Sequence, residues 1–177
     1  MSLIVMKFGG TSVANINKIR NVASIVEKET NGNKLVIVLS AMAGETNKMQ
    51  QYIDEISSVS KLENDLILTS GESVTIALLS AILKKKKIRS IPLLGWQVPI
   101  ITDENYQKAK ILNIDKERIN DFFKQHDVLI IAGFQGINSS GFVTSLGRGG
   151  SDTTAVAIAS AIEADRCDIY TDVDGVY

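Results

Sequence analysis

A short stretch near the end of the chain combines residue types that suit the binding of a charged ligand. Residues 146–155 read LGRGGSDTTA and place three glycines around Arg148, followed by Ser151, Asp152 and two threonines. A helix needs only one serine or aspartate as its N-terminal cap, so most of this set remains for another role. Glycines let a backbone approach a ligand closely, and helix N-termini attract anions. The stretch therefore predicts a polyanionic ligand, although by itself it does not identify one.

A second candidate lies at the other end of the sequence, where Lys7 precedes the glycine pair Gly9 and Gly10. A lysine beside free backbone N–H groups can hold the oxygens of a phosphoryl group during its transfer. Taken alone, Lys7 is better explained as a surface lysine before a tight turn. Its combination with other small or polar strand ends favours phosphate binding instead.

Three further charged residues have more than one possible role. Glu72 opens a helical stretch, where it could complement the helix dipole or bind a substrate ammonium, and the sequence favours neither role. Arg148 stands between glycines, and its planar guanidinium suits a bidentate contact with a carboxylate or a phosphate. Asp152 could cap its helix, orient Lys7 or help to bind a metal–nucleotide complex.

Alternating strand-like and helix-like segments must position these residues. Continuous apolar runs are typical of strands buried on both faces of a parallel sheet, and they predict strands at 3–8, 34–40, 90–94, 128–134 and 167–171. Apolar residues at helical spacing predict helices over 15–29, 49–56, 72–85, 115–124 and 151–162. In the helix over 72–85 the spacing predicts an inward face formed by Val74, Ala77, Leu78, Ala81 and Ile82.

This alternation predicts an α/β fold, a three-layer αβα sandwich with a mainly parallel central sheet, in one domain over residues 1–177. Open α/β sheets bind ligands beyond the carboxyl ends of their strands. Small or polar residues follow four of the predicted strands, at 7–12, 40–47, 133–137 and 171–172. The four exits together predict a cleft at one edge of the sheet.

The composition argues against several classes of protein. A net charge of −1 does not suit a general binder of nucleic acid or anionic membranes. The apolar runs are far shorter than the ~20 residues of a membrane-spanning helix, and the N-terminus does not have the pattern of a secretory signal. The single cysteine, Cys167, fits a reducing compartment. We expect a cytoplasmic protein in which Cys167 is a small buried residue.

Several known site motifs are missing from the sequence. It has no P-loop, no dinucleotide-binding glycine motif after the first strand and no protein-kinase motif set. It also has no cluster of cysteines and histidines, so no protein-held metal site is expected. The single histidine, His126, stands beside Asp127 in a polar turn and is expected to be a solvated surface residue.

The motifs in their order resemble the aspartokinase group of the amino acid kinase family, which shares a carbamate kinase-like sandwich fold. The matching stretches are KFGGTSVA (7–14), SAMAGETN (40–47), SGE (70–72), GWQ (95–97), AGFQG (132–136), LGRGGSDTTAVAIA (146–159) and CDIYTDVDGVY (167–177). The resemblance spans essentially the whole chain. Its two most specific parts are the long match around GRGGSDTTA and the opening KFGGTS.

The resemblance implies ATP-dependent phosphorylation of the side-chain carboxylate of L-aspartate to 4-phospho-L-aspartate, the entry to lysine, diaminopimelate, threonine and methionine synthesis. It implies ATP and Mg²⁺ as cofactors. The positions matching catalytic or backbone-donor residues of the family are Lys7, Gly9, Gly10 and Asp152. The positions matching aspartate-binding residues are Thr46, Glu72, Phe134, Arg148 and Ser151. The positions matching the nucleotide-binding segment are Lys7, Thr171, Asp172 and Tyr177.

The sequence departs from the family pattern at its C-terminus, because the pattern continues past Tyr177 with further nucleotide-binding residues and usually with ACT regulatory domains. We therefore expect a C-terminally incomplete kinase domain that forms a homo-oligomer or associates with a missing C-terminal portion. Two alternatives stay open. The chain could be a noncatalytic remnant or assembly module of a split kinase, or another member of the family such as a glutamate 5-kinase or a uridylate kinase.

Overall fold

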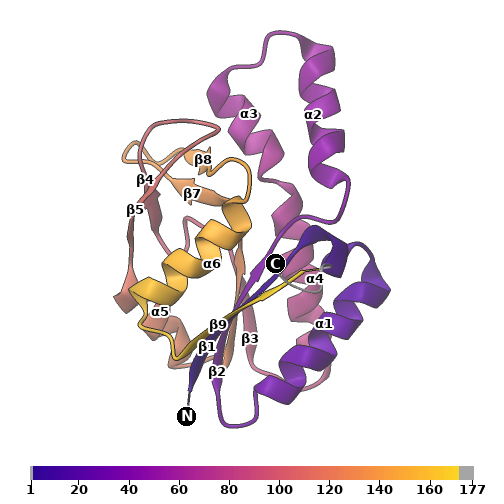
Figure 1. Cartoon of the computed structure of the whole chain (residues 1–177), viewed down its shortest axis with the longest axis vertical. Coiled ribbons are helices and arrows are strands. Elements are labelled where there is room, and N and C mark those ends of the chain that lie inside the picture. Colours follow the sequence, from indigo (N-terminus) through magenta and orange to yellow (C-terminus); the bar gives the residue numbers. More distant parts are fainter. Residues whose placement is uncertain (1, 172–177) are drawn as a thin grey trace, which may run out of the picture.

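The central element of the fold is a parallel sheet of five strands in the order β3-β6-β2-β1-β9 (Figure 1). The computed structural model describes residues 2–171. The strands of this sheet are β1 (Leu3–Phe8), β2 (Lys34–Leu39), β3 (Ser90–Leu93), β6 (Val128–Ala132) and β9 (Arg166–Tyr170). Because all five strands run in the same direction, their carboxyl ends meet at one edge of the sheet.

Helices cover both faces of this sheet. Helices α1 (Ile16–Glu29) and α4 (Gly71–Lys85) pack on one face, and α5 (Lys116–Phe123) and α6 (Gly150–Ala161) pack on the other. Alternate residues of β1 and β2 point into the two cores, so that Met6 and Ile37 contact the first pair of helices and Val5 and Val36 the second. The three-layer αβα sandwich with a parallel sheet is therefore confirmed.

Two additions to the sandwich lie beyond the carboxyl edge of the sheet. A small sheet has the order β5-β4-β7-β8, with β4 (Ile100–Thr102), β5 (Ile111–Ile114), β7 (Gln135–Ile137) and β8 (Val143–Ser145). A helical hairpin, α2 (Glu45–Ile56) and α3 (Lys61–Leu68), projects from the top of the molecule in Figure 1. A short 3₁₀ helix, η1 (Gly10–Val13), follows β1. The small sheet and α3 were not predicted from the sequence, because their short segments show no clear hydrophobic periodicity.

The predicted inward face of α4 is wrong for Val74, Ala77 and Ala81, which are exposed, whereas Leu78 and Ile82 are half-buried and pack against the core. Val74 is 53% exposed, and the buried residues of α4 are Gly71, Glu72, Thr75, Ile76, Leu79, Ser80 and Leu83. The helix carries apolar residues all round, so hydrophobic spacing could not choose between adjacent stripes. The true face begins with polar residues because this end of the helix borders the cavity described below.

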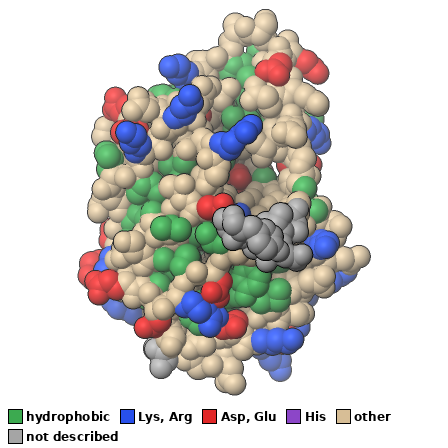
Figure 2. All heavy atoms as spheres, in the orientation of Figure 1, with side chains coloured by type: hydrophobic (Ala, Val, Ile, Leu, Met, Phe, Trp, Pro, Cys, Tyr) green, Lys and Arg blue, Asp and Glu red, His purple; other side chains and the backbone are tan. Residues whose placement is uncertain are grey.

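The predicted burial of Cys167 is also wrong, because the thiol-bearing residue is exposed. Within the part of the chain that the structure describes, β9 is one of the two edge strands of the large sheet, and α6 covers it only in part. Figure 2 shows apolar side chains at the surface over α6. Ile169, two residues further along the same strand face, is 43% exposed. His126 is half-buried, and its ring Nδ1 lies 3.0 Å from the carbonyl oxygen of Phe122.

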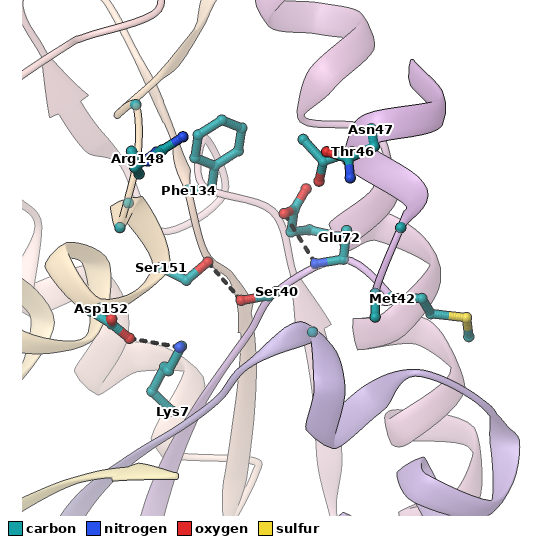
Figure 3. Close-up of a pocket in the computed structure, with 17 residues that line it drawn as sticks. Lys7, Ser40, Met42, Thr46, Asn47, Glu72, Phe134, Arg148, Ser151 and Asp152 are labelled. Carbon is teal, nitrogen blue, oxygen red and sulfur yellow. Dashed lines mark hydrogen bonds and ion pairs between the residues drawn. The ribbon is translucent and has the colours of Figure 1, made fainter. Parts of the chain in front are cut away.

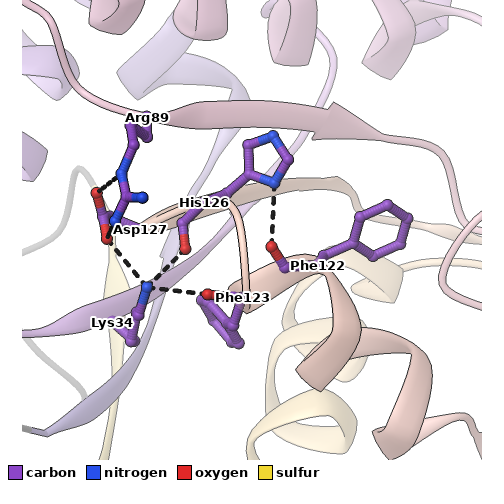
Figure 4. Close-up of polar contacts among 6 residues, drawn as sticks. All are labelled: Lys34, Arg89, Phe122, Phe123, His126 and Asp127. Atoms are coloured by element: carbon purple, nitrogen blue, oxygen red, sulfur yellow. Dashed lines mark hydrogen bonds and ion pairs between the residues drawn. The ribbon is translucent and has the colours of Figure 1, made fainter.

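Paired charges hold the amino ends of three strands together (Figure 4). Asp127, just before β6, accepts hydrogen bonds from Arg89 at 2.8 and 2.9 Å and from Lys34 at 3.0 Å. Lys34 also donates to the carbonyl oxygens of Phe123 and His126, where α5 ends. The hydrogen bonds from Arg89, followed by those from Lys34, hold the pKa of Asp127 below its usual range. These contacts lie away from the carboxyl edge and stabilise the opposite end of the sheet.

The segment Lys61–Lys85, which comprises α3 and α4, is long and apolar enough to cross a membrane by length and composition alone. Packing accounts for part of this composition, because Ile76, Leu79 and Leu83 of α4 belong to the core that α1 and α4 form on one face of the large sheet. The segment also buries the carboxylates of Asp65 and Glu72.

Candidate functional site

A cavity of about 370 Å³ opens at the carboxyl edge of the large sheet, where the predicted strand exits converge. Figure 3 shows that its walls come from widely separated parts of the chain. The residues that line it are Lys7, Gly10, Ser40, Ala41, Met42, Ala43, Gly44, Thr46, Asn47, Glu72, Phe134, Gly147, Arg148, Gly149, Gly150, Ser151 and Asp152. The predicted cleft at this edge is thus present.

An ion pair forms the floor of the cavity. Lys7 is near the end of β1, and its Nζ lies 2.6 Å from Oδ1 of Asp152 in the first turn of α6. The lysine side chain is 11% exposed and that of the aspartate 48%, so the pair is shielded on one side and open on the other. Gly9 lies beside the ammonium, because a Cβ placed on this glycine would be 3.3 Å from Nζ. The geometry favours the interpretation in which Asp152 orients Lys7.

Glu72 is a buried carboxylate with one oxygen left over. It lies in the first turn of α4 and is 2% exposed. Its Oε1 accepts a hydrogen bond of 3.1 Å from the backbone N–H of Ala41, whereas Oε2 has no hydrogen-bond partner among the described residues. Burial raises the pKa of Glu72 to about 7, against the opposing effect of hydrogen bonds from the backbone of Glu72 and Ala41. Because Oε2 has no partner among the described residues, it can pair with a cation that is not part of the chain.

The approach of Glu72 to Ala41 depends on the glycine before it. A Cβ on Gly71 would lie 2.7 Å from the Cβ of Ala41. Only a glycine therefore lets the N-terminus of α4 come close enough to the end of β2 for the Glu72–Ala41 hydrogen bond.

The entrance of α6 packs tightly against the ends of two strands. Ser40, just after β2, donates a hydrogen bond of 3.0 Å to Oγ of Ser151. A Cβ on Gly133, after β6, would lie 2.7 Å from the same oxygen. This close packing holds the N-terminus of α6, with its partial positive charge, against the cavity.

Phe134 and Arg148 form the wall opposite Glu72 (Figure 3). Phe134 has a φ of 68°, in the left-handed region, and its N–H donates to Oγ1 of Thr154 at 3.1 Å. A Cβ on Gly150 would lie 2.8 Å from the Phe134 ring, so the ring lies directly on the glycine loop. A non-glycine residue in this backbone region often marks a functional site. Arg148 is exposed, and its guanidinium points into the cavity beside the ring.

The N-terminus of α2 closes the cavity above Glu72. Thr46 and Asn47 lie in its first turn, after Gly44 with a φ of 87°. Figure 3 places both side chains on the Glu72 side of the cavity. Two facing walls, one with a free carboxylate oxygen and one with a guanidinium, suit a ligand that carries both an ammonium and a carboxylate.

The structure brings together eight of the predicted site residues, which are Lys7, Gly10, Thr46, Glu72, Phe134, Arg148, Ser151 and Asp152. Gly9 adjoins them through Lys7. Thr171 follows β9 at the same edge of the sheet and is exposed, whereas Asp172 and Tyr177 lie outside the described residues. Ser40, Ala41 and Asn47 also line the cavity but were not predicted as site residues. All three belong to the stretch at 40–47 that carries part of the resemblance.

The fold is that of the amino acid kinase family, and the chain belongs to that family, whose sequence model matches residues 2–177. Within this family the chain is similar to aspartokinases. It is 48% identical to the aspartokinase of Rickettsia bellii over all of this chain and 45% of that protein. The chain thus spans about half the length of the curated relatives that it matches.

Solved structures of aspartokinases share the fold. The structure of the aspartate kinase from Synechocystis is 42% identical, with a TM-score of 0.83 over 99% of this chain and 29% of that chain. The structure of E. coli aspartokinase III in complex with aspartate and ADP is 26% identical, with a TM-score of 0.82 over 99% of this chain and 50% of that chain.

Proposed function

We propose that this chain carries out the ATP-dependent phosphorylation of the side-chain carboxylate of L-aspartate, giving 4-phospho-L-aspartate and ADP. The observation that carries the proposal is that one cavity is lined by Glu72 with its free oxygen, by Arg148 and by the Lys7–Asp152 ion pair. The similarity to aspartokinases, one of them solved with aspartate and ADP, supports it.

In this proposal the upper part of the cavity binds the amino acid. Oε2 of Glu72 pairs with the α-ammonium group, and the guanidinium of Arg148 binds the α-carboxylate in a bidentate manner. Thr46, Phe134 and Ser151 line the space between these two groups. An acceptor held at both its charged ends leaves only its side-chain carboxylate to point toward Lys7.

In the lower part of the cavity, near Lys7, the phosphoryl group is transferred to the aspartate side chain. The aspartate side chain has a reference pKa near 3.9 and is already ionised at pH 7, so its attack requires no general base. One carboxylate oxygen forms a bond to the γ-phosphorus while the bond from that phosphorus to the bridging oxygen breaks, and ADP leaves with the electron pair. Lys7 and the backbone N–H groups of Gly9 and Gly10 stabilise the charge on the transferred oxygens. Asp152 orients Lys7 from 2.6 Å.

The nucleotide is proposed to arrive as its magnesium complex. The described residues hold no group of three or more histidine, cysteine, aspartate or glutamate side chains that could form a metal site. The phosphates of ATP would therefore supply most of the ligands of the ion, and Asp152, which lines the cavity, could contribute a carboxylate oxygen. Thr171, together with Asp172 and Tyr177, is proposed to contact the nucleotide.

The proposal can be tested by acceptor choice. The chain is incubated with MgATP, hydroxylamine and either aspartate, glutamate or UMP, and both acyl hydroxamate and ADP are measured. We expect hydroxamate with aspartate and none after Lys7→Ala. Turnover with glutamate or UMP but not with aspartate would overturn the choice of substrate.

A calorimetric titration with aspartate in the absence of ATP tests amino-acid binding at Glu72 and Arg148 without turnover. We expect saturable binding that Glu72→Gln weakens strongly. A wild-type chain that binds neither aspartate nor MgATP would instead support a noncatalytic remnant or an assembly module.

A further inference from the structure

Asp65 is a buried carboxylate away from the proposed chemistry. It lies in α3 and is 0% exposed. Its Oδ2 accepts hydrogen bonds from the backbone N–H groups of Ser145 at 2.7 Å and Gln107 at 3.0 Å, and its Oδ1 accepts one of 2.9 Å from the hydroxyl of Ser145. Burial of a carboxylate is costly unless its charge is stabilised, and three hydrogen bonds, two from Ser145 in β8 and one from Gln107 in the loop between β4 and β5, provide that stabilisation.

The groups that Asp65 binds lie directly beneath the loop that carries Arg148. Ser145 is the last residue of β8, three positions before Arg148. Gln107 has a φ of 70°, and a Cβ on Gly147 would lie 2.9 Å from its carbonyl oxygen. Gly147 therefore packs against the turn that Asp65 holds in place.

Further hydrogen bonds make this a rigid support. Ala109 donates to the carbonyl oxygen of Ser145 at 2.9 Å, and Leu146 donates to that of Phe134 at 3.0 Å. The loop that begins at Leu146 is thus held on both sides before it reaches the exposed Arg148. The long side chain of Arg148 forms no ion pair with the described residues, so the backbone of its loop decides where the guanidinium lies.

The helical segment that carries Asp65 also carries Glu72. The two carboxylates are seven positions apart, about two helical turns, within one segment from Lys61 to Lys85. Thr69 anchors the junction between α3 and α4, because its N–H and hydroxyl both donate to the carbonyl oxygen of Asp65 and its carbonyl oxygen accepts a hydrogen bond of 3.1 Å from the side chain of Gln135. One end of this segment thus holds the Arg148 loop, while the next helix presents Glu72 to the cavity.

We propose that Asp65 is a positioning residue that sets the spacing between Glu72 and Arg148 and thereby the affinity for the amino-acid acceptor. The proposal rests on the proposed function, in which these two residues bind the α-ammonium and α-carboxylate groups. Asp65 itself does not line the cavity, so it acts only through the backbone of residues 145–148. Its role differs from general stabilisation of the core because it connects the two opposite walls of one binding site.

Two substitutions separate geometry from charge. Asp65→Ala removes both carboxylate oxygens and with them all three hydrogen bonds. Asp65→Asn keeps the pattern, because its amide oxygen can accept from both backbone N–H groups and its NH₂ group can donate to the Ser145 hydroxyl. Ser80→Ala is the matched control, since Ser80 is also buried and hydrogen-bonded, but its partner is Ser90 at the amino end of β3, the opposite edge of the large sheet from this loop.

Calorimetric titration of the full chain with aspartate gives the main readout. We expect Asp65→Ala to weaken aspartate binding about tenfold, in the range of couplings between connected groups. Asp65→Asn and Ser80→Ala should stay within about twofold of wild type. In an Arg148→Ala background, Asp65→Ala should cause no further loss. Equal losses in both backgrounds, or a loss with Asp65→Asn as large as with Asp65→Ala, would overturn the proposal.

Hydrogen exchange of the backbone amides at 145–149 gives a readout that does not depend on the ligand. We expect faster exchange there in Asp65→Ala, and in the milder Ser145→Ala if Asp65→Ala does not fold, with wild-type exchange in Asp65→Asn. Unchanged exchange in the disrupted variants would overturn the positioning role. If wild-type protein does not bind aspartate at all, the proposed function fails, and the exchange result still decides whether Asp65 holds the loop.

Discussion

Replacement of Glu72 by glutamine should make the protein more stable at pH 8 and, at the same time, abolish most of its aspartate binding. The carboxylate is 2% exposed, and its second oxygen is without a hydrogen-bond partner among the described residues. Glutamine has the same shape, and its amide oxygen can still accept from the N–H of Ala41. The substitution therefore removes the buried charge while keeping the packing.

The size of the effect follows from the pKa of Glu72, which burial raises from 4.5 to about 7. Because the folded state binds the proton more tightly than the unfolded state, the carboxyl group lowers stability progressively as the pH rises from about 4.5 to about 7. A difference of this size corresponds to about 3 kcal/mol above pH 7. The glutamine variant escapes this loss, so its advantage should be near zero at pH 4.5 and approach about 3 kcal/mol at pH 8.

The assay is urea unfolding of both proteins at pH 5 and pH 8, compared through the free energy of unfolding. Glu63→Gln is the control on the same helical segment, since hydrogen bonds to Ser60 hold the pKa of Glu63 below its usual range. Loss of the Glu63 carboxylate should lower the free energy of unfolding at pH 8, and the decrease should be smaller in acid. If the gain in free energy of unfolding from Glu72→Gln is equal at both pH values, this carboxyl group does not titrate near neutrality, and burial does not raise its pKa as stated.

Three further predictions concern the site and the sheet. Aspartate affinity should rise between pH 6 and pH 8 because Glu72 must lose its proton to pair with the α-ammonium, and calorimetric Kd values that do not change with pH would contradict this. Gly71→Ala should destabilise the protein by about 1–3 kcal/mol although alanine usually favours a helix, because its Cβ would lie 2.7 Å from that of Ala41; thermal unfolding measures the change, and a stabilised variant would disprove the close approach. Asp127→Ala should lower stability at pH 7, with the difference from wild type vanishing in acid, because hydrogen bonds from Arg89 lower the pKa of this carboxyl group; unfolding midpoints between pH 3 and pH 7 test it.

Much of the candidate site could be predicted from strand ends. Lys7, Ser40 and Phe134 all follow or end buried apolar strands, and parallel strands bring their carboxyl ends to one edge. The residues at these exits are therefore neighbours whatever the details of packing. Asp65 could not be predicted in this way, because α3 has no clear periodicity and two of the three hydrogen bonds to its carboxylate come from backbone N–H groups, which nearly every residue carries.

The groups available at the carboxyl edge follow from residue types and local patterns, namely a lysine followed by glycines, a serine after β2 and the glycine–arginine–serine–aspartate loop at the entrance of α6. These features are local, because they depend on backbone freedom and on residue type. The burial and the ionisation of these groups depend on long-range packing. Glu72 could equally have been a solvated helix-dipole partner, and its raised pKa arises from the packing of α4 against the end of β2. The inward face of α4 and the exposure of Cys167 depend in the same way on which neighbours cover them. Burial and ionisation are properties of the surroundings of a side chain, and those surroundings come from segments far apart in the sequence.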